Sequence, residues 1–96
     1  MTSKQRAYLS SLANPMNPIF QIGKASLTPE NVEAICQALD KRELIKVAVL
    51  KNCDDNPKEI ANVIAERTHS EVVKVIGKKI ILFKQNKKNT KYKLPE

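Results

Sequence analysis

Residues 18–50, PIFQIGKASLTPENVEAICQALDKRELIKVAVL, decide the fold of this 96-residue chain. The stretch opens with a short β-rich segment, 18–22, and closes with an almost wholly apolar one, 44–50. Between them, Thr28-Pro29-Glu30 is a well-formed helix start, with a hydroxyl at the N-cap, proline at the first helical position and an acid in the first turn. The apolar residues of this helix follow at helical spacing: Val32, Ile35, Cys36 and Leu39. The stretch therefore predicts two parallel strands joined by a right-handed helical crossover.

A further helix is predicted on each side of this unit. Residues 2–14 place apolar side chains at helical spacing behind a Thr-Ser capping candidate, and Pro15 ends the pattern. Asn56-Pro57 begins the other helix, with asparagine as the N-cap and Glu59 at the position that completes a capping box. Both helices are expected to pack on the sheet.

The chain then turns back on itself in a predicted hairpin. Residues 72–76 and 80–83 are rich in β-branched side chains, and Gly77 between them fits the first position of a type II′ turn. The order is therefore αβαβαββ, an α/β fold of the two-layer α+β type with a mixed four-stranded sheet. The hairpin is expected to supply the antiparallel edge of that sheet, and residues 1–84 are predicted to form a single domain.

Charge is distributed unevenly along the chain. The formal net charge is +7, yet residues 1–73 hold nine bases and nine acids, whereas residues 74–96 hold eight lysines and one acid. Residues 85–96 have no hydrophobic periodicity and are predicted to be a basic, disordered tail. A tail that only keeps a small domain soluble is the alternative interpretation. The asymmetry favours a polyanionic partner, either nucleic acid or an anionic membrane surface.

Composition excludes several classes of protein. The chain is too short for two lobes, and its 42% hydrophobic content is that of a folded globular chain rather than a disordered one. No run approaches the ~18 apolar residues of a membrane span, and the N-terminus lacks the apolar segment of a secretory signal. A cytoplasmic protein, favoured to be a monomer, is expected, with Cys36 and Cys53 as free thiols.

Catalytic chemistry has little support in the sequence. The only histidine, His69, lies at the end of a predicted helix, where a solvated or capping role is favoured over a catalytic one. Asp54 and Asp55 form an adjacent acidic pair in a polar turn, where simple solvation is favoured over metal binding. The sequence contains no metalloprotease, phosphate-loop, zinc or dinucleotide-binding motif. We therefore expect no enzymatic activity, no metal and no cofactor.

The strongest candidate for a binding site is the loop Gly23-Lys24-Ala25-Ser26-Leu27-Thr28. It joins a strand to a helix N-terminus, so unpaired backbone N–H groups, the positive end of the helix dipole and the Lys24 ammonium are predicted to point to one place. A GxxG loop with a related geometry clamps the sugar-phosphate backbone in KH domains. A glycine turn required only for steric reasons is the alternative interpretation.

The chain resembles the chloroplast RNA splicing and ribosome maturation (CRM) domain family, and in particular its bacterial single-domain members of the YhbY type. The matching segments extend from the first helix to the last strand: Tyr8-Leu9, Leu12-Ala13, Pro18, Gln21-Ile22-Gly23-Lys24, Leu27-Thr28, Ala38-Leu39, Glu43-Leu44-Ile45-Lys46-Val47, Ile60-Ala61, Val75-Ile76-Gly77-Lys78 and Leu82-Phe83. The Gly-Lys loop, the Glu-Leu-Ile-Lys run and the closing Ile-Gly-Lys hairpin carry the resemblance in combination.

The resemblance implies a fold similar to the C-terminal domain of translation initiation factor three and binding to structured RNA. For the bacterial members it also implies association with precursors of the large ribosomal subunit. Ser26 departs from the family's Gly-Lys-x-Gly loop, and a serine at that position is strained if φ there is positive. Lys41-Arg42 stand where a histidine is common, and Phe83-Lys84 replace Tyr-Arg, so the charge is kept but the planar guanidinium is lost.

The predicted mechanism is electrostatic capture of the RNA backbone, with shape rather than base identity selecting the RNA. The predicted RNA-binding residues come from the loop, the strands, the hairpin and the tail: Gly23, Lys24, Ala25, Ser26, Thr28, Lys46, Lys78, Lys79, Lys84, Lys87 and Lys88. The alternative function is a small protein-protein adaptor whose acidic helices dock on a partner and whose basic tail only confers solubility. Membrane binding is not expected, because the tail offers no second anchor.

Overall fold

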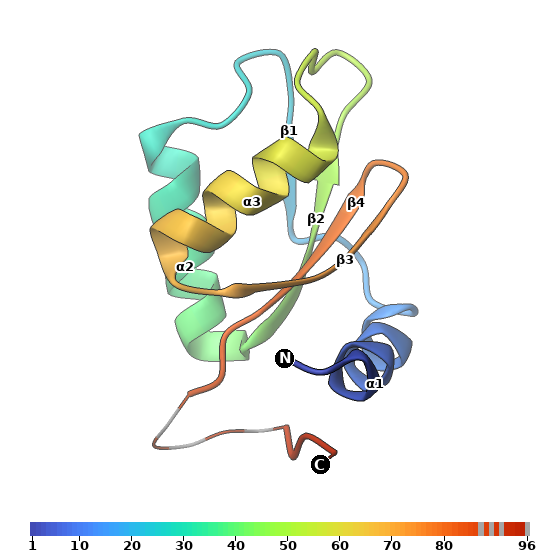
Figure 1. Ribbon diagram of the computed structural model, residues 1–96. Helices are drawn as coiled ribbons and strands as arrows, with labels where there is room; N and C mark the ends of the chain where they lie inside the picture. The colour runs from blue at the N-terminus through green and yellow to red at the C-terminus, as the bar shows by residue number, and fades with distance from the viewer. Residues whose placement is uncertain (87, 89, 91, 96) are drawn as a thin grey trace.

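The computed structural model describes residues 1–86, 88, 90 and 92–95. Within them, helices and strands follow one another in the predicted order: α1 (Ser3–Ala13), β1 (Phe20–Ile22), α2 (Pro29–Arg42), β2 (Leu44–Val49), α3 (Pro57–Thr68), β3 (Glu71–Ile76) and β4 (Lys79–Phe83). The strands form one mixed sheet in the order β1-β2-β4-β3 (Figure 1). The αβαβαββ order and the mixed four-stranded sheet are therefore confirmed.

The helices begin at the predicted caps. Thr2 and Gln5 exchange both hydrogen bonds of a capping box at the start of α1, and Thr28 Oγ1 accepts the N–H of Asn31 at 3.1 Å at the start of α2. At α3, Asn56 Oδ1 accepts the N–H of Lys58 at 2.8 Å, one residue earlier than a capping box requires. The predicted capping box at α3 is therefore wrong, although the predicted cap residue is right.

The hairpin supplies the antiparallel edge of the sheet, as predicted. β1 and β2 pair in parallel, also as expected, and β4 lies between β2 and β3 and is antiparallel to both, so β3 is the edge strand. The four residues of β4 after Lys79 are all buried, whereas β3 exposes Glu71, Lys74 and Ile76. A strand without a polar face needs apolar cover on both faces of the sheet, and the two cores described below provide it.

The turn of the hairpin has the predicted geometry. Gly77 has φ +57°, and the residues of the described chain with positive φ do not include Lys78. This pattern, positive φ at the first of two turn residues, is that of a type II′ turn. Its twist matches the right-handed twist of β3 and β4.

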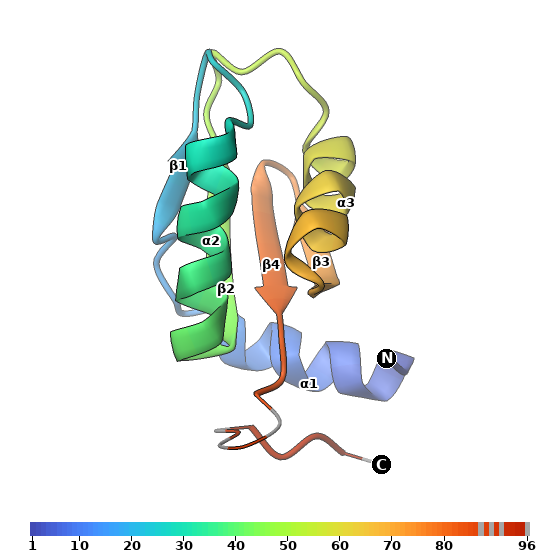
Figure 2. The ribbon, with the colours of Figure 1, turned by 90° about the vertical axis from the view of Figure 1, so that its left-hand side faces the viewer.

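The sheet is covered on both faces, but unequally. α2 and α3 lie side by side on one face, and α1 crosses the other face at the end remote from the hairpin (Figures 1 and 2). The larger core, under α2 and α3, includes Ile35, Val47, Ile64, Ile80 and Leu82. The smaller core, under α1, consists of Leu9, Ala13, Leu44, Val73, Ile81 and Phe83. Because α1 spans only part of its face, the two rows nearest the hairpin combine buried Ile81 and Ala48 with exposed side chains, namely Gln21, Lys74, Ile76 and Lys79.

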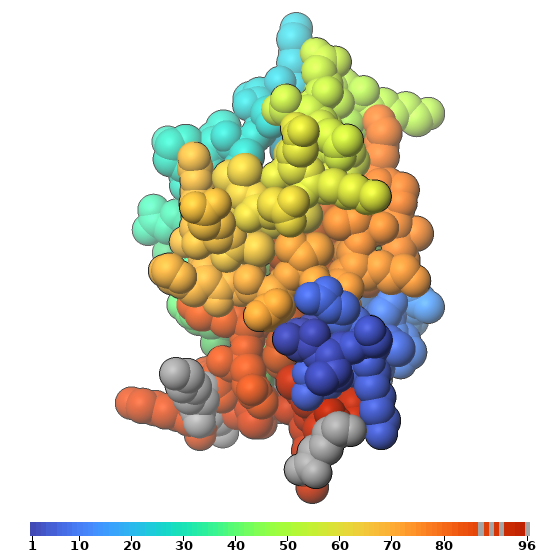
Figure 3. Space-filling view, in the orientation of Figure 1, coloured from blue at the N-terminus to red at the C-terminus, as the bar shows by residue number. Residues whose placement is uncertain are grey.

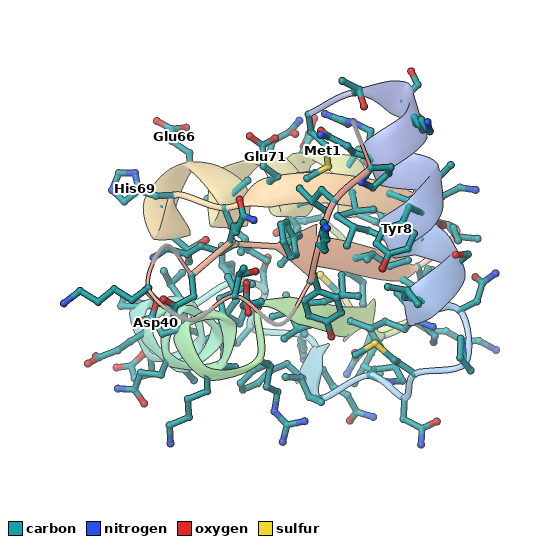
Figure 4. The ribbon with its side chains drawn as sticks, turned by 90° about the horizontal axis from the view of Figure 1, so that it is seen from below. Met1, Tyr8, Asp40, Glu66, His69 and Glu71 are labelled. Atoms are coloured by element: carbon teal, nitrogen blue, oxygen red, sulfur yellow. The ribbon has the colours of Figure 1, made fainter. Side chains whose placement is uncertain are left out.

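The described residues of the C-terminal segment, 85–95, pack against the smaller core. Tyr92 meets the ring of Phe83 edge-on, with 5.9 Å between ring centroids, and Leu94 lies beside it. Gln5 Nε2 donates to the carbonyl of Pro95 at 3.1 Å. Seen from below, the segment crosses the sheet next to α1 (Figure 4). The sequence predicts a disordered tail here, but Tyr92 and Leu94 provide apolar side chains that remove part of the smaller core from water.

Glu43 connects this segment to the end of α2. Its side chain is 1% exposed, and its Oε2 accepts the N–H of Asn86 at 3.0 Å and the hydroxyl of Thr90 at 2.7 Å. A buried carboxylate requires hydrogen-bond donors, and the C-terminal segment supplies two of them.

None of the helices among the described residues has the length and apolar character of a membrane span.

Replacing Glu43 by alanine is expected to destabilise the protein. The change leaves the N–H of Asn86 and the hydroxyl of Thr90 without their acceptor, at a cost of about 3 kcal/mol in the free energy of unfolding. Urea denaturation followed by circular dichroism measures the loss. Glu33→Ala, an exposed acid on α2, is the control and should change stability by less than about 0.5 kcal/mol. Equal unfolding midpoints for the two variants would contradict the assigned role of Glu43.

Candidate nucleic-acid interface

Three connections gather at one end of the sheet. β1 and β2 run parallel, and β3 runs in the same direction because both β2 and β3 are antiparallel to β4. The loop 23–28, the loop 50–56 and the hairpin turn therefore lie at the same end, at the top of Figure 1. Hydrogen bonds join them: the N–H of Leu50 donates to Ile22 O at 2.8 Å, and the N–H of Val49 donates to Lys78 O at 2.7 Å.

The Gly-Lys loop, residues 23–28, begins with a tight turn. The N–H of Ser26 donates to Gly23 O at 2.9 Å, and Lys24 and Ala25 at the tip are exposed. No described residue accepts a hydrogen bond from the backbone N–H of Lys24 or Ala25. Thr28 serves as the N-cap of α2, so its hydroxyl is engaged within the helix start. The loop thus leaves two backbone N–H groups without an acceptor among the described residues and one ammonium exposed, which are groups that can bind an anion.

Ser26 has a left-handed backbone conformation. Its φ is +57°, so the strain expected for serine in place of glycine is present, at roughly 1–2 kcal/mol. Its hydroxyl donates to a carboxylate oxygen of Asp55, in the neighbouring loop. Asp55 therefore places a negative charge beside the Gly-Lys loop, which a plain phosphate-binding loop would not have.

The open part of the sheet carries a second group of basic side chains. Residues paired directly across neighbouring strands project from the same face, so each set of paired positions forms a row. Two rows lie on the α1 side, one with Lys46, Ile81 and Lys74 and the next with Gln21, Ala48, Lys79 and Ile76. We call the exposed part of these rows, together with Lys78 at the turn, the open sheet face. The hairpin stands at the surface between α3 and α1 (Figure 3).

The lysines of the open sheet face differ in solvent exposure and in their hydrogen bonds. Lys74, Lys78 and Lys79 are exposed, whereas Lys46 is half-buried and its ammonium donates to Asn14 O at 3.1 Å, at the end of α1. Lys74 is absent from the predicted site. It follows Val73 in a bulge that places both residues opposite Ile81, and no local sequence signal shows that bulge. The alternating pattern of β3 alone does not assign Lys74 to a face.

Two predicted residues lie at the other end of the molecule. Lys84 follows the last residue of β4, about 17 Å from Lys79 at ~3.4 Å per residue, and its ammonium lies 3.3 Å from Asp40 Oδ1. Lys88 follows in the C-terminal segment. Lys87 lies outside the described residues. The predicted site is therefore divided, with the Gly-Lys loop and Lys46, Lys78 and Lys79 towards one end and Lys84 and Lys88 at the other.

The two faces of the molecule differ in charge. The helices α2 and α3 carry five acids and four bases, and the loop between β2 and α3 adds Asp54, Asp55 and Lys51. On the opposite side, α1 contributes Lys4 and Arg6 without an acid, and the rows of the open sheet face contribute lysines without an acid. Glu71, the acid of β3, lies at the far end, paired with Phe83. Positive potential is thus concentrated on the α1 side of the sheet.

The histidine and thiol groups of the chain belong to His69, Cys36 and Cys53. In the part of the chain that the structure describes, no three histidine, cysteine, aspartate or glutamate side chains gather to hold a metal ion. His69 is the C-cap of α3, with φ +56°, and its side chain points away from the molecule (Figure 4). Cys36 and Cys53 are free thiols, as predicted, and Cys53 belongs to the larger core.

Comparison with known proteins places this architecture in a family. The model of the CRS1/YhbY (CRM) domain matches residues 1–84. The chain belongs to the CRM family. The resemblance identified from the Gly-Lys loop, the Glu-Leu-Ile-Lys run and the hairpin is therefore confirmed.

Relatives of the chain match it over nearly its full length. The Bacillus subtilis protein named "Probable RNA-binding protein YqeI" is 39% identical over 99% of both chains. A Haemophilus influenzae protein named "RNA-binding protein" is 32% identical over 99% of this chain and 95% of its own. The solution structure of a hypothetical protein from Staphylococcus aureus is 45% identical, with a TM-score of 0.84 over 99% of each chain. The CRM fold described above is thus shared with a solved structure.

Proposed function

We propose that this CRM protein binds structured RNA by neutralising backbone phosphates with the Gly-Lys loop and the open sheet face. The observation that carries the proposal is the charge difference between the two sides of the sheet. Lys46, Lys74 and Lys79 project from rows that contain no acid, and Lys24 extends the positive surface at the same end. Phosphate neutralisation releases counterions and supplies most of the affinity of such an interface.

Backbone contact rather than base reading follows from the position of the aromatic residues. Single-stranded bases are usually bound by stacking on exposed aromatic rings of a sheet. Here Phe20 packs against the larger core, and Phe83 is buried beneath Tyr92. The open sheet face instead presents lysines with Gln21 and Ile76. This surface suits the regular backbone of a folded RNA, whose shape selects it.

Ribosomal RNA in precursors of the large subunit is the proposed target, and the role is that of a non-catalytic assembly factor acting in the cytoplasm. The RNA-binding names of the bacterial relatives support RNA as the partner, and the resemblance to the CRM family implies the ribosomal target. The Gly-Lys loop acts as a KH-like clamp in this proposal, because its exposed N–H groups and ammonium can contact adjacent phosphate oxygens.

Reversing one charge on the open sheet face should weaken RNA binding. Lys79→Glu is expected to lower affinity for a folded ribosomal RNA fragment about tenfold, or ~1.4 kcal/mol, and to reduce the salt slope of log K by roughly 0.7 to 0.9 for the lost phosphate contact. Filter binding over a salt series measures both. Lys41→Glu makes the same charge change at the exposed end of α2 and is the matched control. Equal losses for the two variants would show that only net charge matters.

The two ends of the predicted site should differ in their contribution. Lys24→Glu is expected to weaken binding more than Lys88→Glu, because Lys24 lies on the proposed interface and Lys88 lies in the C-terminal segment at the other end of the sheet. The same filter-binding assay measures the difference. Binding of Lys24→Glu as tight as that of the wild-type chain at near-physiological salt would remove the Gly-Lys loop from the interface.

Association with ribosomal precursors is testable in cell extracts. The protein should sediment with large-subunit precursors on a sucrose gradient and should leave them after RNase treatment or in high salt, because counterion release makes the contact salt-dependent. Association that resists RNase and follows a protein would instead favour the adaptor function. Lys79→Glu in the same gradient links the outcome to the open sheet face.

A further inference from the structure

The Gly-Lys loop is joined to the loop 50–56 by side chains of both. The hydroxyl of Ser26 donates to the Asp55 carboxylate, and a Cβ at Gly23 would lie 3.4 Å from Asn52 Oδ1, which shows how closely the loops approach. After Ser26, Leu27 packs against the larger core. The exposed tip, Lys24 and Ala25, is therefore held at one end by the Gly23 turn and at the other by Ser26.

The conformation of Ser26 requires this support. Glycine adopts positive φ about as readily as negative φ, whereas a residue with a Cβ is disfavoured there by contact with the following carbonyl. Ser26 nevertheless has φ +57°. Its charge-assisted hydrogen bond to Asp55 is the side-chain interaction that opposes the strain. Without that bond, more extended conformations of Ser26 become favourable, and Lys24 leaves its position.

We propose that Asp55 is a positioning residue for RNA binding: it holds Ser26, and through it Lys24, in the conformation that contacts RNA. The inference rests on the proposed function. The proposal predicts that removing the Asp55 carboxylate lowers RNA affinity. Charge alone predicts the opposite, because removing a carboxylate beside a phosphate-binding loop should strengthen binding to a polyanion. The sign of the effect therefore separates positioning from simple repulsion.

Asp54 provides a matched control for charge. It precedes Asp55 in the same loop, is exposed, and has no hydrogen bond or ion pair to a described residue. Asp54→Ala should leave RNA affinity unchanged or raise it by up to about twofold, the effect of one exposed charge ~10 Å from a phosphate. Asp55→Ala should lower affinity about tenfold, because the binding-competent fraction of the loop falls by that factor when the bond is lost.

Ser26 allows the bond to be broken without any change of charge. Ser26→Ala removes the hydroxyl and keeps Asp55, and it should lower affinity for a short ribosomal RNA hairpin about as much as Asp55→Ala does. Ser26→Gly should bind within about twofold of the wild-type chain, because glycine populates the left-handed conformation without assistance. In the Ser26→Gly background, Asp55→Ala should no longer weaken binding.

Fluorescence anisotropy with the labelled hairpin measures these five variants and Lys24→Glu beside the wild-type chain, and circular dichroism establishes that each is folded. Weakening by Asp55→Ala and Ser26→Ala, relieved by Ser26→Gly, supports the proposal. Affinity of Asp55→Ala equal to or above that of Asp54→Ala overturns it, while the proposed function stands if Lys24→Glu still weakens binding. Loss of the Lys24→Glu effect removes the Gly-Lys loop from the interface and overturns the proposal with it, and no binding by the wild-type chain overturns the proposed function.

Discussion

β4 is buried on both of its faces, and the rest of the structure depends on that constraint. Ile80, Ile81, Leu82 and Phe83 form an unbroken apolar run, so neither side of the strand can meet water. Its two edges are hydrogen-bonded to β2 and β3. Helices α2 and α3 cover Ile80 and Leu82, whereas α1 and the C-terminal segment cover Ile81 and Phe83. The buried Glu43 carboxylate completes this cover by binding Asn86 and Thr90.

On one face of the sheet, α1 and the C-terminal segment cover the rows remote from the hairpin but not all of the rows next to it. The uncovered side chains are where a polyanion can approach. α1 reaches only the rows remote from the hairpin, so the side chains nearest the turn need not be apolar. Lysines occupy those positions, and the acids lie mainly on the opposite helical layer. The same topology brings the Gly-Lys loop to this end, because β1 and β2 are parallel. The strand topology and the positions of the lysines therefore place the candidate interface at the hairpin end of the α1 side of the sheet.

Local signals in the sequence predicted much of this arrangement. Thr28-Pro29 and Asn56-Pro57 mark helix starts by local chemistry, and Gly77 marks the turn for the same reason. The sequence does not order β4 between β2 and β3, because strand order depends on long-range pairing. The predicted site groups Lys84 with Lys79 because the two are close in sequence. In the structure they lie at opposite ends of β4, and Lys84 pairs with Asp40. The Ser26–Asp55 bond joins residues 29 positions apart, which no motif specifies.

The central claim is that RNA meets the α1 side of the sheet and the Gly-Lys loop, and not the layer of α2 and α3. Titration of the isotope-labelled chain with a short ribosomal RNA hairpin, followed by amide chemical shifts, tests it directly. The account predicts the largest shifts at Lys24, Ala25 and the amides around Lys74, Lys78 and Lys79, with little change on the outer faces of α2 and α3. Shifts concentrated along α2 and α3, with the hairpin and the Gly-Lys loop unchanged, would contradict it.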